Sequence, residues 1–279
     1  MTTILDGKAL ADKISEDLKK EISDNKYTPT LAVVIVGQNP ASQIYVRNKN
    51  RKALELGMTS IVVELPETIS QTELETEIDK LAKNKKVNAI LVQLPLPKHI
   101  NTQAIIEKIP PQKDVDGFHP YNIGRLYSGE KPFSKACTPK GILRILEEYK
   151  IDVAGKQVVV IGRSNIVGKP VAAMLTNLNA TVTLCHSKTQ NLQEQTQKAD
   201  ILICAIGKPK FITADYIKEN TVVIDVGINR QDDGKLVGDV DFENVKAKSS
   251  YITPVPKGVG PMTIAMLMEN SLELYKQQL

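Results

Sequence analysis

Tyr45 and Lys49 lie four residues apart, a spacing that puts a phenol and an ammonium group on one face of a helix. Both side chains could then address one ligand, although such pairs are also common on plain exposed helix faces. Gln93 lies within an apolar run and needs a hydrogen-bond partner there, which a lysine amine could be. Asp116, in an Asp-Val-Asp-Gly segment, could accept two adjacent N–H donors of a flat heterocycle, or it could simply form an Asx turn before the glycine.

A second kind of chemistry is indicated by the segment GRSNIVGKP at 162–170, which follows the apolar run VVVIG. A strand that ends in glycine and leads into a helix points backbone N–H groups and the positive helix end at one place, which suits a phosphate. The segment is neither GxGxxG nor a P-loop, because a proline follows Gly168-Lys169 and the first glycine lies one residue too far upstream. A turn without a ligand is the alternative, but its place after the first strand of a parallel sheet favours a dinucleotide.

The charges after the next strand favour NADP over NAD. An NAD site usually has an acid at the end of the second strand, which binds the ribose 2′-hydroxyl. Here the strand ATVTLC leads into His-Ser-Lys-Thr, without an acid. Arg163, Ser187 and Lys188 could instead hold a 2′-phosphate, although 188–189 could also be a solvated loop.

The order of these motifs excludes one class of oxidoreductase. Tyr-x-x-x-Lys is the catalytic pair of short-chain dehydrogenases, where the glycine-rich loop comes first in the chain. In this sequence Tyr45 and Lys49 come well before the turn at 162–170. The short-chain dehydrogenase family is therefore excluded.

Strand and helix patterns alternate and predict an α/β fold with parallel sheets made of βαβ units. In the N-terminal half we expect helices over 8–22, from Pro40 to near Gly57, and after the Ser70/Glu73 capping box, with strands over 31–37, 60–65 and 88–95. In the C-terminal half we expect helices over 141–150 and 262–275 and strands over 158–162, 180–185, 201–207 and 221–227, with 251–256 as a possible fifth. This arrangement puts Lys49 on a helix and Gln93 at a strand end.

Two domains are expected from the length and from one irregular segment. Residues 110–138 contain prolines, glycines and short polar pieces with little periodicity, so we place the junction there. We expect a catalytic α/β domain over residues 1–137 and a Rossmann-like NADP-binding domain over 138–260. The last helix, 261–279, is expected to pack back on the first domain.

Composition excludes several classes of protein. The 279 residues are 42% hydrophobic and 24% charged, which is ordinary for a soluble globular chain, and the net charge of +4 does not predict nucleic-acid binding. The apolar runs are far shorter than the ~18 residues of a membrane span, and the N-terminus lacks the apolar stretch of a signal peptide. Cys137, Cys185 and Cys204 form no CxxC pair, so neither disulfides nor a metal site is indicated. We expect a reduced, cytoplasmic protein without a membrane or nucleic-acid partner.

Taken together, the motifs resemble one family over essentially the whole chain, the bifunctional methylenetetrahydrofolate dehydrogenase/methenyltetrahydrofolate cyclohydrolases. The matching segments, in the family's order and spacing, are SQIYVRNKNRKALELGM, LVQLPLP, PQKDVDGF, CTPKGI, VVVIGRSNIVGKP, ATVTLCHSKT, DVGINR, GDVDF and TPVPKGVGPMT.

The resemblance implies a two-domain α/β enzyme that binds folate in a cleft and NADP on its C-terminal domain. It implies that Lys49 is catalytic, that Tyr45 orients the pterin, that Gln93 hydrogen-bonds Lys49 and that Asp116 binds the pterin N–H donors. The cofactor contacts it implies are Gly162, Arg163, Ser164, Ser187 and Ile228. It also implies a homodimer joined through the NADP domain and a place in the one-carbon metabolism that serves purine, methionine and histidine biosynthesis.

One position departs from the family pattern. The family usually has Pro-Gly-Gly-Val-Gly-Pro before the last helix, whereas this chain has lysine at the second position, Lys257. We expect Lys257 to have ordinary backbone angles and to point into water. Contact with the folate glutamate tail or with a cofactor phosphate is the alternative.

Two other functions compete with this one. A different two-domain NADP oxidoreductase, similar to shikimate dehydrogenase, would leave Tyr45, Gln93 and Asp116 unexplained. A non-catalytic sensor of a dinucleotide or folate would keep the binding residues, but the intact set that includes Lys49 argues against loss of catalysis.

Overall fold

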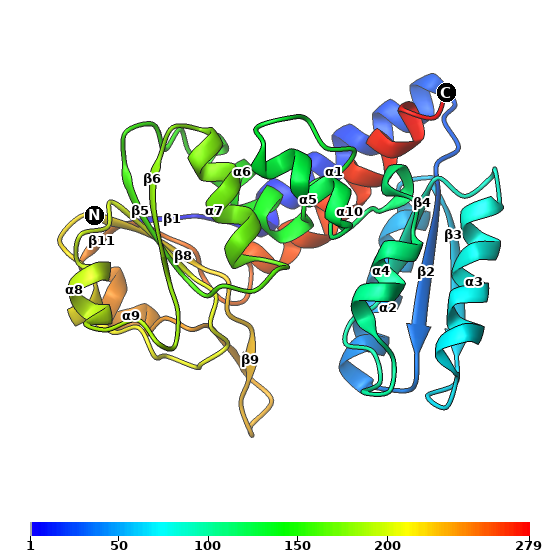
Figure 1. Cartoon of the computed structure of the whole chain (residues 1–279). Coiled ribbons are helices and arrows are strands. Elements are labelled where there is room, and N and C mark those ends of the chain that lie inside the picture. Colours follow the sequence, from blue (N-terminus) through cyan, green and yellow to red (C-terminus); the bar gives the residue numbers. More distant parts are fainter. Residues whose placement is uncertain (1) are drawn as a thin grey trace. The chain divides into compact units, whose positions relative to one another are not determined.

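The computed structural model describes residues 2–279 and divides into two compact units. Unit 1 contains the described residues up to Asp12 together with Thr138–Thr263, and unit 2 contains Lys13–Cys137 and Ile264–Leu279. Each unit has its own sheet and its own core (Figure 1). The expected α/β class with parallel sheets is confirmed.

Unit 2 is built on a three-stranded parallel sheet of β2 (Thr30–Val36), β3 (Thr59–Leu65) and β4 (Ala89–Val92), with β2 in the centre. Every residue of β2 is buried, since a central parallel strand is covered on both faces. Its β-branched and aliphatic residues suit this position, which explains the uninterrupted apolar run in the sequence.

Helices α2 (Pro40–Glu55), α3 (Gln71–Lys83) and α4 (Thr102–Lys108) follow the three strands in turn. The predicted starts of the first two are confirmed. The side chain of Asn39 accepts a hydrogen bond from Ser42 N at 3.1 Å, and Pro40 occupies the first turn. Ser70 and Glu73 form the expected capping box.

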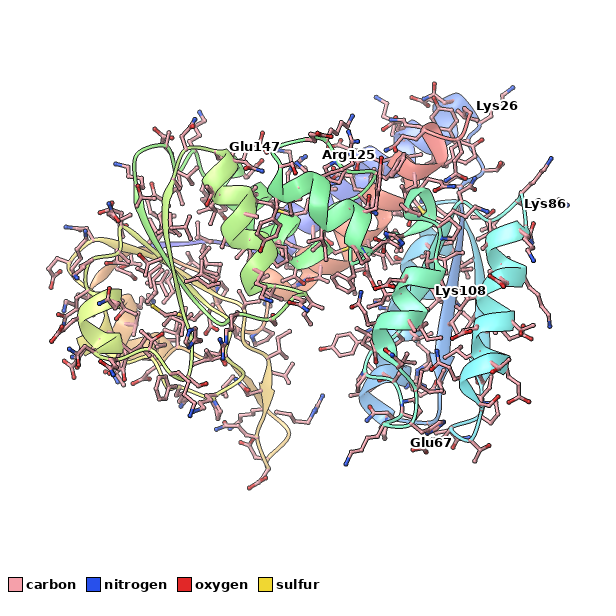
Figure 2. All side chains as sticks on the ribbon, in the orientation of Figure 1. Lys26, Glu67, Lys86, Lys108, Arg125 and Glu147 are labelled. Atoms are coloured by element: carbon pink, nitrogen blue, oxygen red, sulfur yellow. The ribbon has the colours of Figure 1, made fainter. Side chains whose placement is uncertain are left out.

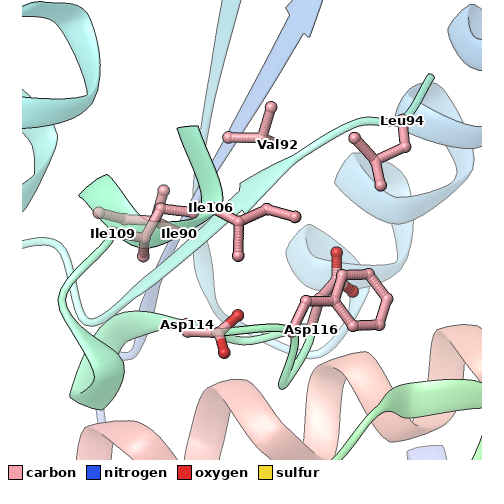
Figure 3. A pocket seen from close by; sticks show the side chains of 8 residues that line it. Ile90, Val92, Leu94, Ile106, Ile109, Asp114 and Asp116 are labelled. Atoms are coloured by element: carbon pink, nitrogen blue, oxygen red, sulfur yellow. The ribbon is translucent and has the colours of Figure 1, made fainter. Parts of the chain in front are cut away.

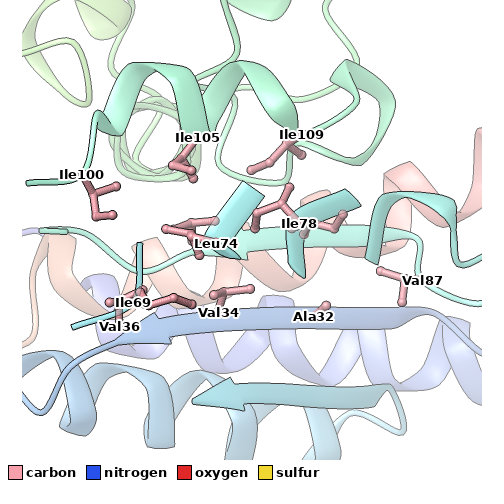
Figure 4. Close-up of a cluster of buried hydrophobic side chains, with 12 residues drawn as sticks. Ala32, Val34, Val36, Ile69, Leu74, Ile78, Val87, Ile100, Ile105 and Ile109 are labelled. Carbon is pink, nitrogen blue, oxygen red and sulfur yellow. The ribbon is translucent and has the colours of Figure 1, made fainter. Parts of the chain in front are cut away.

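Alternate residues of β2 point toward α3 and α4 and form one core cluster (Figure 4). The cluster consists of Ala32, Val34, Val36, Ile69, Leu74, Ile78, Val87, Ile90, Val92, Ile100, Ile105 and Ile109. Charged side chains such as Glu67 and Lys86 project outward instead (Figure 2). The core therefore leaves the ends of the strands available for polar residues.

The irregular segment after β4 contains structure that its sequence does not indicate. It holds a 3₁₀ turn, η1 (Pro111–Lys113), and a helix, α5 (Pro120–Tyr127). The buried carboxylate of Asp114 accepts hydrogen bonds from Gly117 N at 3.1 Å and His119 N at 2.8 Å. Hydrogen bonds to one carboxylate, rather than an apolar stripe, hold this segment in place, so its sequence shows no hydrophobic periodicity.

Unit 1 contains a six-stranded parallel sheet in the order β1-β11-β8-β7-β5-β6. Its strands are β1 (Thr3–Ile4), β5 (Gln157–Ile161), β6 (Thr181–Cys185), β7 (Ile201–Cys204), β8 (Thr221–Asp225) and β11 (Ser249–Ile252). A short antiparallel pair, β9 (Asn229–Arg230) and β10 (Leu236–Val237), is separate from this sheet. The four predicted strands and the possible fifth are all present.

The sixth strand, β1, was not predicted. It pairs with β11, with Thr3 opposite Tyr251, and two residues are too few to produce a pattern. The expected division put residues 1–12 with the catalytic domain, whereas the structure places the described ones in unit 1 because of this pairing.

Unit 1 also contains helices α6 (Cys137–Glu148), α7 (Gly168–Asn177), α8 (Leu192–Thr196) and α9 (Phe242–Lys246) and the 3₁₀ turn η2 (Ala214–Tyr216). Two longer helices, α1 (Gly7–Asn25) and α10 (Val259–Lys276), cross the boundaries between the units along the chain. From Ile264 onward the chain belongs to unit 2. Among residues 2–279, no helix has the length and apolar character needed to cross a membrane.

The turn before α10 corrects the expectation for Lys257. Its φ is +83°, in the left-handed region that favours glycine, so the expectation of ordinary angles was wrong. The turn is held in this form because Lys257 O accepts a hydrogen bond from Lys8 N at 2.9 Å. The next residue, Gly258, has no room for a Cβ, which would collide with Pro254 O. The side chain of Lys257 is exposed, as expected.

Replacing Lys257 with glycine should stabilise unit 1. A left-handed L-residue costs about 1–2 kcal/mol that glycine avoids, partly offset by the greater freedom of glycine in the unfolded chain. We expect Lys257→Gly to raise the free energy of unfolding by about 1 kcal/mol in urea titrations. Lys131→Gly, at an exposed residue that is not among the positive-φ positions, is the control and should destabilise. An equal loss of unfolding free energy in Lys257→Gly and Lys131→Gly would contradict this account.

Candidate active site

Lys49 and Gln93 are joined by a hydrogen bond in unit 2. Lys49, on α2, donates from Nζ to Gln93 Oε1 at 3.0 Å, and both side chains are half-buried. Gln93 directly follows β4, and its own N–H donates to Val34 O at 2.8 Å. Its Nε2 donates to Leu94 O at 2.7 Å, which fixes the orientation of the amide. The oxygen of Gln93 therefore faces the lysine, and the remaining N–H bonds of the ammonium are available to a ligand.

Tyr45 lies one helical turn before Lys49 on α2. Its side chain is 42% exposed, although a phenol ring is more often buried. The spacing puts the ring and the ammonium on the same helix face. An exposed ring beside a cationic group can stack on a flat ligand.

Asp116 lies close enough to Lys49 for their charges to interact. Burial raises the pKa of Asp116 to about 6, and the charge of Lys49 opposes this rise by favouring the carboxylate. The neighbouring Asp114 carboxylate raises the pKa further, while the Cys137 thiol, whose Sγ is 3.8 Å from Asp116 Oδ1, lowers it. The structure thus brings Lys49, Gln93 and Asp116 together, and Tyr45 lies on the same helix.

A small pocket adjoins Asp116 and explains why its carboxyl is poorly solvated (Figure 3). Aliphatic side chains on β4, on α4 and just after each of them form most of its wall. The lining residues are Ile90, Val92, Leu94, Ile106, Ile109, Asp114, Asp116 and Phe118. An acceptor in apolar surroundings strongly favours a ligand that supplies N–H donors over one that leaves the acceptor unpaired.

Asn270 supports this site and was missed by the sequence analysis. It is fully buried on α10, and its Nδ2 donates to Val115 O at 2.9 Å and Lys135 O at 2.8 Å. These bonds hold the backbone next to Asp116. The available signal was an asparagine four residues from both Met266 and Leu274, in the apolar stripe of the helix, since a buried amide must find partners.

The glycine turn of unit 1 has the shape of a phosphate cradle. Gly162 follows β5 with φ +123°, and a Cβ there would collide with Ala205 O. A Cβ on Gly168, the first residue of α7, would collide with Gly162 O. Only glycine fits at either position, so the turn closes tightly at the start of the helix.

The Ser164 side chain binds the backbone at the start of α7, a role that the sequence analysis did not assign. Its Oγ accepts hydrogen bonds from Val167 N at 3.1 Å and Gly168 N at 3.4 Å. The hydroxyl proton remains available to a ligand. Arg163, beside it, is exposed.

Arg163 and Ser187 follow neighbouring strands. β5 and β6 pair in parallel, and Gly162 N donates to Cys185 O at 2.9 Å, so both segments leave the sheet at one edge. After β6, His186 N donates to Thr189 Oγ1 at 2.8 Å, and Ser187 is exposed at the tip of this turn. An arginine and a hydroxyl without a nearby acid in this turn fit a phosphate on the ribose.

Ile228 leaves the sheet at the same edge, after β8, and is 44% exposed. Its Cδ1 lies 3.2 Å from where a Cβ of Gly260 would be. The five residues expected at a cofactor site therefore follow β5, β6 and β8 at the carboxyl edge of one sheet, where open α/β sheets bind their ligands.

Comparisons with known proteins agree with this geometry. The family model for the tetrahydrofolate dehydrogenase/cyclohydrolase catalytic domain matches residues 5–116. The model for the NAD(P)-binding domain of the same family matches residues 136–279. A bifunctional protein FolD of Bacillus cereus is 55% identical over 280 residues, which cover 99% of this chain and 98% of that protein.

Solved structures give the same result. The bifunctional enzyme FolD from Campylobacter jejuni superposes with a TM-score of 0.98 at 51% identity, over 100% of both chains. FolD from Trypanosoma brucei, complexed with NADP cofactor and inhibitor, has a TM-score of 0.94 at 38% identity, over 99% of this chain and 98% of the other. Shikimate dehydrogenase from Aquifex aeolicus, at a TM-score of 0.53 and 17% identity over 89% of this chain and 92% of the other, shares only the fold.

The two family models together span most of the sequence, and a relative more than half identical covers nearly all of it. The chain belongs to the tetrahydrofolate dehydrogenase/cyclohydrolase family.

Proposed function

We propose that this protein carries out two consecutive reactions on a folate. It oxidises 5,10-methylenetetrahydrofolate to 5,10-methenyltetrahydrofolate with NADP and then hydrolyses the product to 10-formyltetrahydrofolate. The observation that carries the proposal is the hydrogen-bonded Lys49–Gln93 pair with Asp116 in reach of its charge. Likeness to the methylenetetrahydrofolate dehydrogenase/cyclohydrolase of Campylobacter jejuni, at 51% identity, supports both activities.

The oxidation depends mainly on orientation. A hydride leaves the methylene carbon between N5 and N10, and NADP, when bound, accepts it. The folate product is a cation, so no proton needs to be removed from it. Asp116 would hold the N–H donors of the pterin, and the exposed ring of Tyr45 would stack on the bicyclic system. Fixing the reacting carbon in this way lowers the entropic part of the barrier.

The hydrolysis needs proton transfer. Water adds to the carbon between N5 and N10 and loses a proton, the bond from this carbon to N5 then breaks, and the hydroxyl proton moves to N5 while the formyl group stays on N10. Lys49 is the group placed to move these protons, and Gln93 holds its amine in position. One proton is released overall, which balances the charge of the methenyl cation.

The preference for NADP over NAD follows from the residues at the carboxyl edge of the sheet in unit 1. Arg163 would pair with the 2′-phosphate of NADP, and Ser187 would donate a neutral hydrogen bond to it. Gly162 and Ser164 would bind the diphosphate at the start of α7, and Ile228 would contact the cofactor from the loop after β8.

Two further assignments belong to this proposal. The protein would act in the cytoplasm, which is supported by a sequence whose three cysteines form no CxxC pair. It would serve purine, methionine and histidine biosynthesis by interconverting one-carbon folates.

Lys49→Met should separate the two reactions. The wild-type protein should form NADPH from 5,10-methylenetetrahydrofolate and NADP without accumulating the methenyl compound. Lys49→Met should lose cyclohydrolase activity by about a hundredfold or more, the usual contribution of a general acid–base group.

Lys52→Met is the matched control, since Lys52 lies on the same helix and pairs with Glu55 at 3.1 Å. It should keep both activities. Methenyl hydrolysis by Lys49→Met at the wild-type rate would overturn the role of Lys49. NADP binding without turnover in the wild type would favour a sensor, and turnover of shikimate instead would favour the other oxidoreductase.

Folate affinity should depend on the ionisation of Asp116. Only the carboxylate can accept two N–H donors at once, so the KM for the methenyl substrate should rise as the pH falls below about 6, where the group gains a proton. Asp116→Asn should have a high KM that does not change with pH. Asp79→Asn, at a surface carboxylate that pairs with Lys108, should follow the wild type. A wild-type KM that stays level through this range would contradict the assignment.

We also propose a homodimer formed through the NADP-binding unit. β6 is an edge strand of the six-stranded sheet, and an edge strand presents unpaired backbone groups to a partner. Sedimentation velocity should therefore give the mass of two chains at micromolar concentration. The mass of one chain across the whole concentration range would contradict the dimer.

A further inference from the structure

Two buried aspartates in unit 1 lie outside the residues assigned above. Asp225 is the last residue of β8, and its Oδ1 accepts hydrogen bonds from Gly227 N at 3.0 Å and Asp239 N at 2.9 Å. Its Oδ2 accepts from Val240 N at 3.0 Å. The side chain thus ties the loop after β8 to the segment at 239–240.

Asp239 is fully buried and binds the backbone of one loop and a side chain of another. Its Oδ2 accepts from Ile206 N at 2.7 Å and Gly207 N at 3.0 Å, in the loop after β7. Its Oδ1 accepts from Lys208 N and from Asn229 Nδ2, both at 2.9 Å. One carboxylate therefore holds the loops after β7 and β8 together.

These loops lie at the edge where the cofactor residues gather. β8, β7 and β5 are neighbours in the parallel sheet, so their carboxyl ends share one edge. Ala205, which begins the loop held by Asp239, is packed so closely on Gly162 that no side chain fits there. Ile228 lies between Gly227, which is bonded to Asp225, and Asn229, which is bonded to Asp239.

Two glycines show that the backbone closes directly around the carboxylates. A Cβ on Gly227 would collide with the carboxyl group of Asp239, and a Cβ on Gly238 would collide with that of Asp225. At these two points the backbone therefore touches each carboxylate directly.

We propose that Asp225 and Asp239 are positioning residues that hold the loops after β7 and β8 in the form that binds NADP, so that NADP affinity falls when the Asp225 carboxylate gains a proton. The inference rests on the proposed cofactor site, which it deepens. Neither aspartate touches the cofactor, and both act through the backbone that carries Ile228 and adjoins Gly162.

The electrostatic surroundings agree with this role. In the described part of the chain, the donors that contact the two carboxylates are backbone or amide N–H groups. Burial raises the pKa of Asp225 to about 7, and the negative charge of Asp239 contributes to the rise. The Cys204 thiol also faces them, and its pKa is raised well above its usual value by burial and by both carboxylates. Cys204 therefore stays neutral, and Asp225 takes up a proton near neutral pH.

The first test measures NADP binding and cyclohydrolase activity side by side. Asp239→Asn places an NH₂ group against N–H donors, so calorimetry should show NADP binding weakened by about tenfold or more, the factor expected for one unpaired buried donor. Methenyl hydrolysis uses residues of unit 2 and no cofactor, and it should stay within about twofold of the wild type, which a general loss of folding would not allow.

Asp200→Asn is the matched control. Asp200 precedes β7 at the opposite end of the strand, where it accepts from Gln157 N at 2.9 Å and pairs with Lys218 at 2.7 Å. Its NADP affinity should equal that of the wild type. Wild-type affinity in Asp239→Asn would overturn the proposal.

Asn229→Ala covers the case in which Asp239→Asn does not fold. It removes one donor to Asp239 from a half-buried residue, and NADP binding should weaken by a smaller factor. Unchanged binding in Asn229→Ala would then overturn the proposal.

The second test uses pH. The 2′-phosphate of NADP ionises near pH 6 itself, so the informative quantity is the ratio of the Kd of Asp225→Asn to that of the wild type. This ratio should be largest above about pH 7 and should approach one as the pH falls, because the wild-type carboxyl then gains its proton. A ratio that does not change with pH would overturn the proposal. If the wild type catalyses neither reaction, the proposed function fails, while NADP calorimetry still decides the role of the pair.

Discussion

Both units meet the same constraint, which is that backbone N–H groups leaving a parallel sheet have lost their strand partners and must bond to something else. Buried carboxylates supply the acceptors. Asp114 does so for the segment after β4, and Asp225 and Asp239 do so for the loops after β7 and β8. The loops that carry Asp116 and Ile228 are therefore rigid without belonging to a helix or a strand.

The cost of this arrangement is electrostatic. A carboxylate enclosed by backbone loses most of its hydration, so its pKa rises, as it does for Asp114 and Asp225. Asp116 shares the apolar surroundings but differs in having the Lys49 ammonium within range, which favours its charged form. This contrast distinguishes Asp116, which we propose binds the folate, from the aspartates that hold the backbone.

Much of the fold could be predicted from local pattern. The caps at Asn39 and Ser70 and the fully apolar run of β2 are signals that residues close together in the chain produce and that do not need tertiary contacts. Three features whose stabilising partner is distant in sequence were not predicted. β1 exists because of β11, α5 lies in a segment organised by Asp114, and Asn270 is explained only by the carbonyls of Val115 and Lys135.

By itself, the sequence determined the family, the α/β class and the identity of the residues that could do chemistry, because motif order and residue type are properties of the chain. Only the tertiary structure decided that Lys257 adopts a left-handed backbone, that Asn270 binds the carbonyls of Val115 and Lys135, and that Asp239 joins two loops. Each of these depends on packing between segments far apart in the chain, and hydrogen-bond geometry and φ are set by that packing rather than by neighbouring residues.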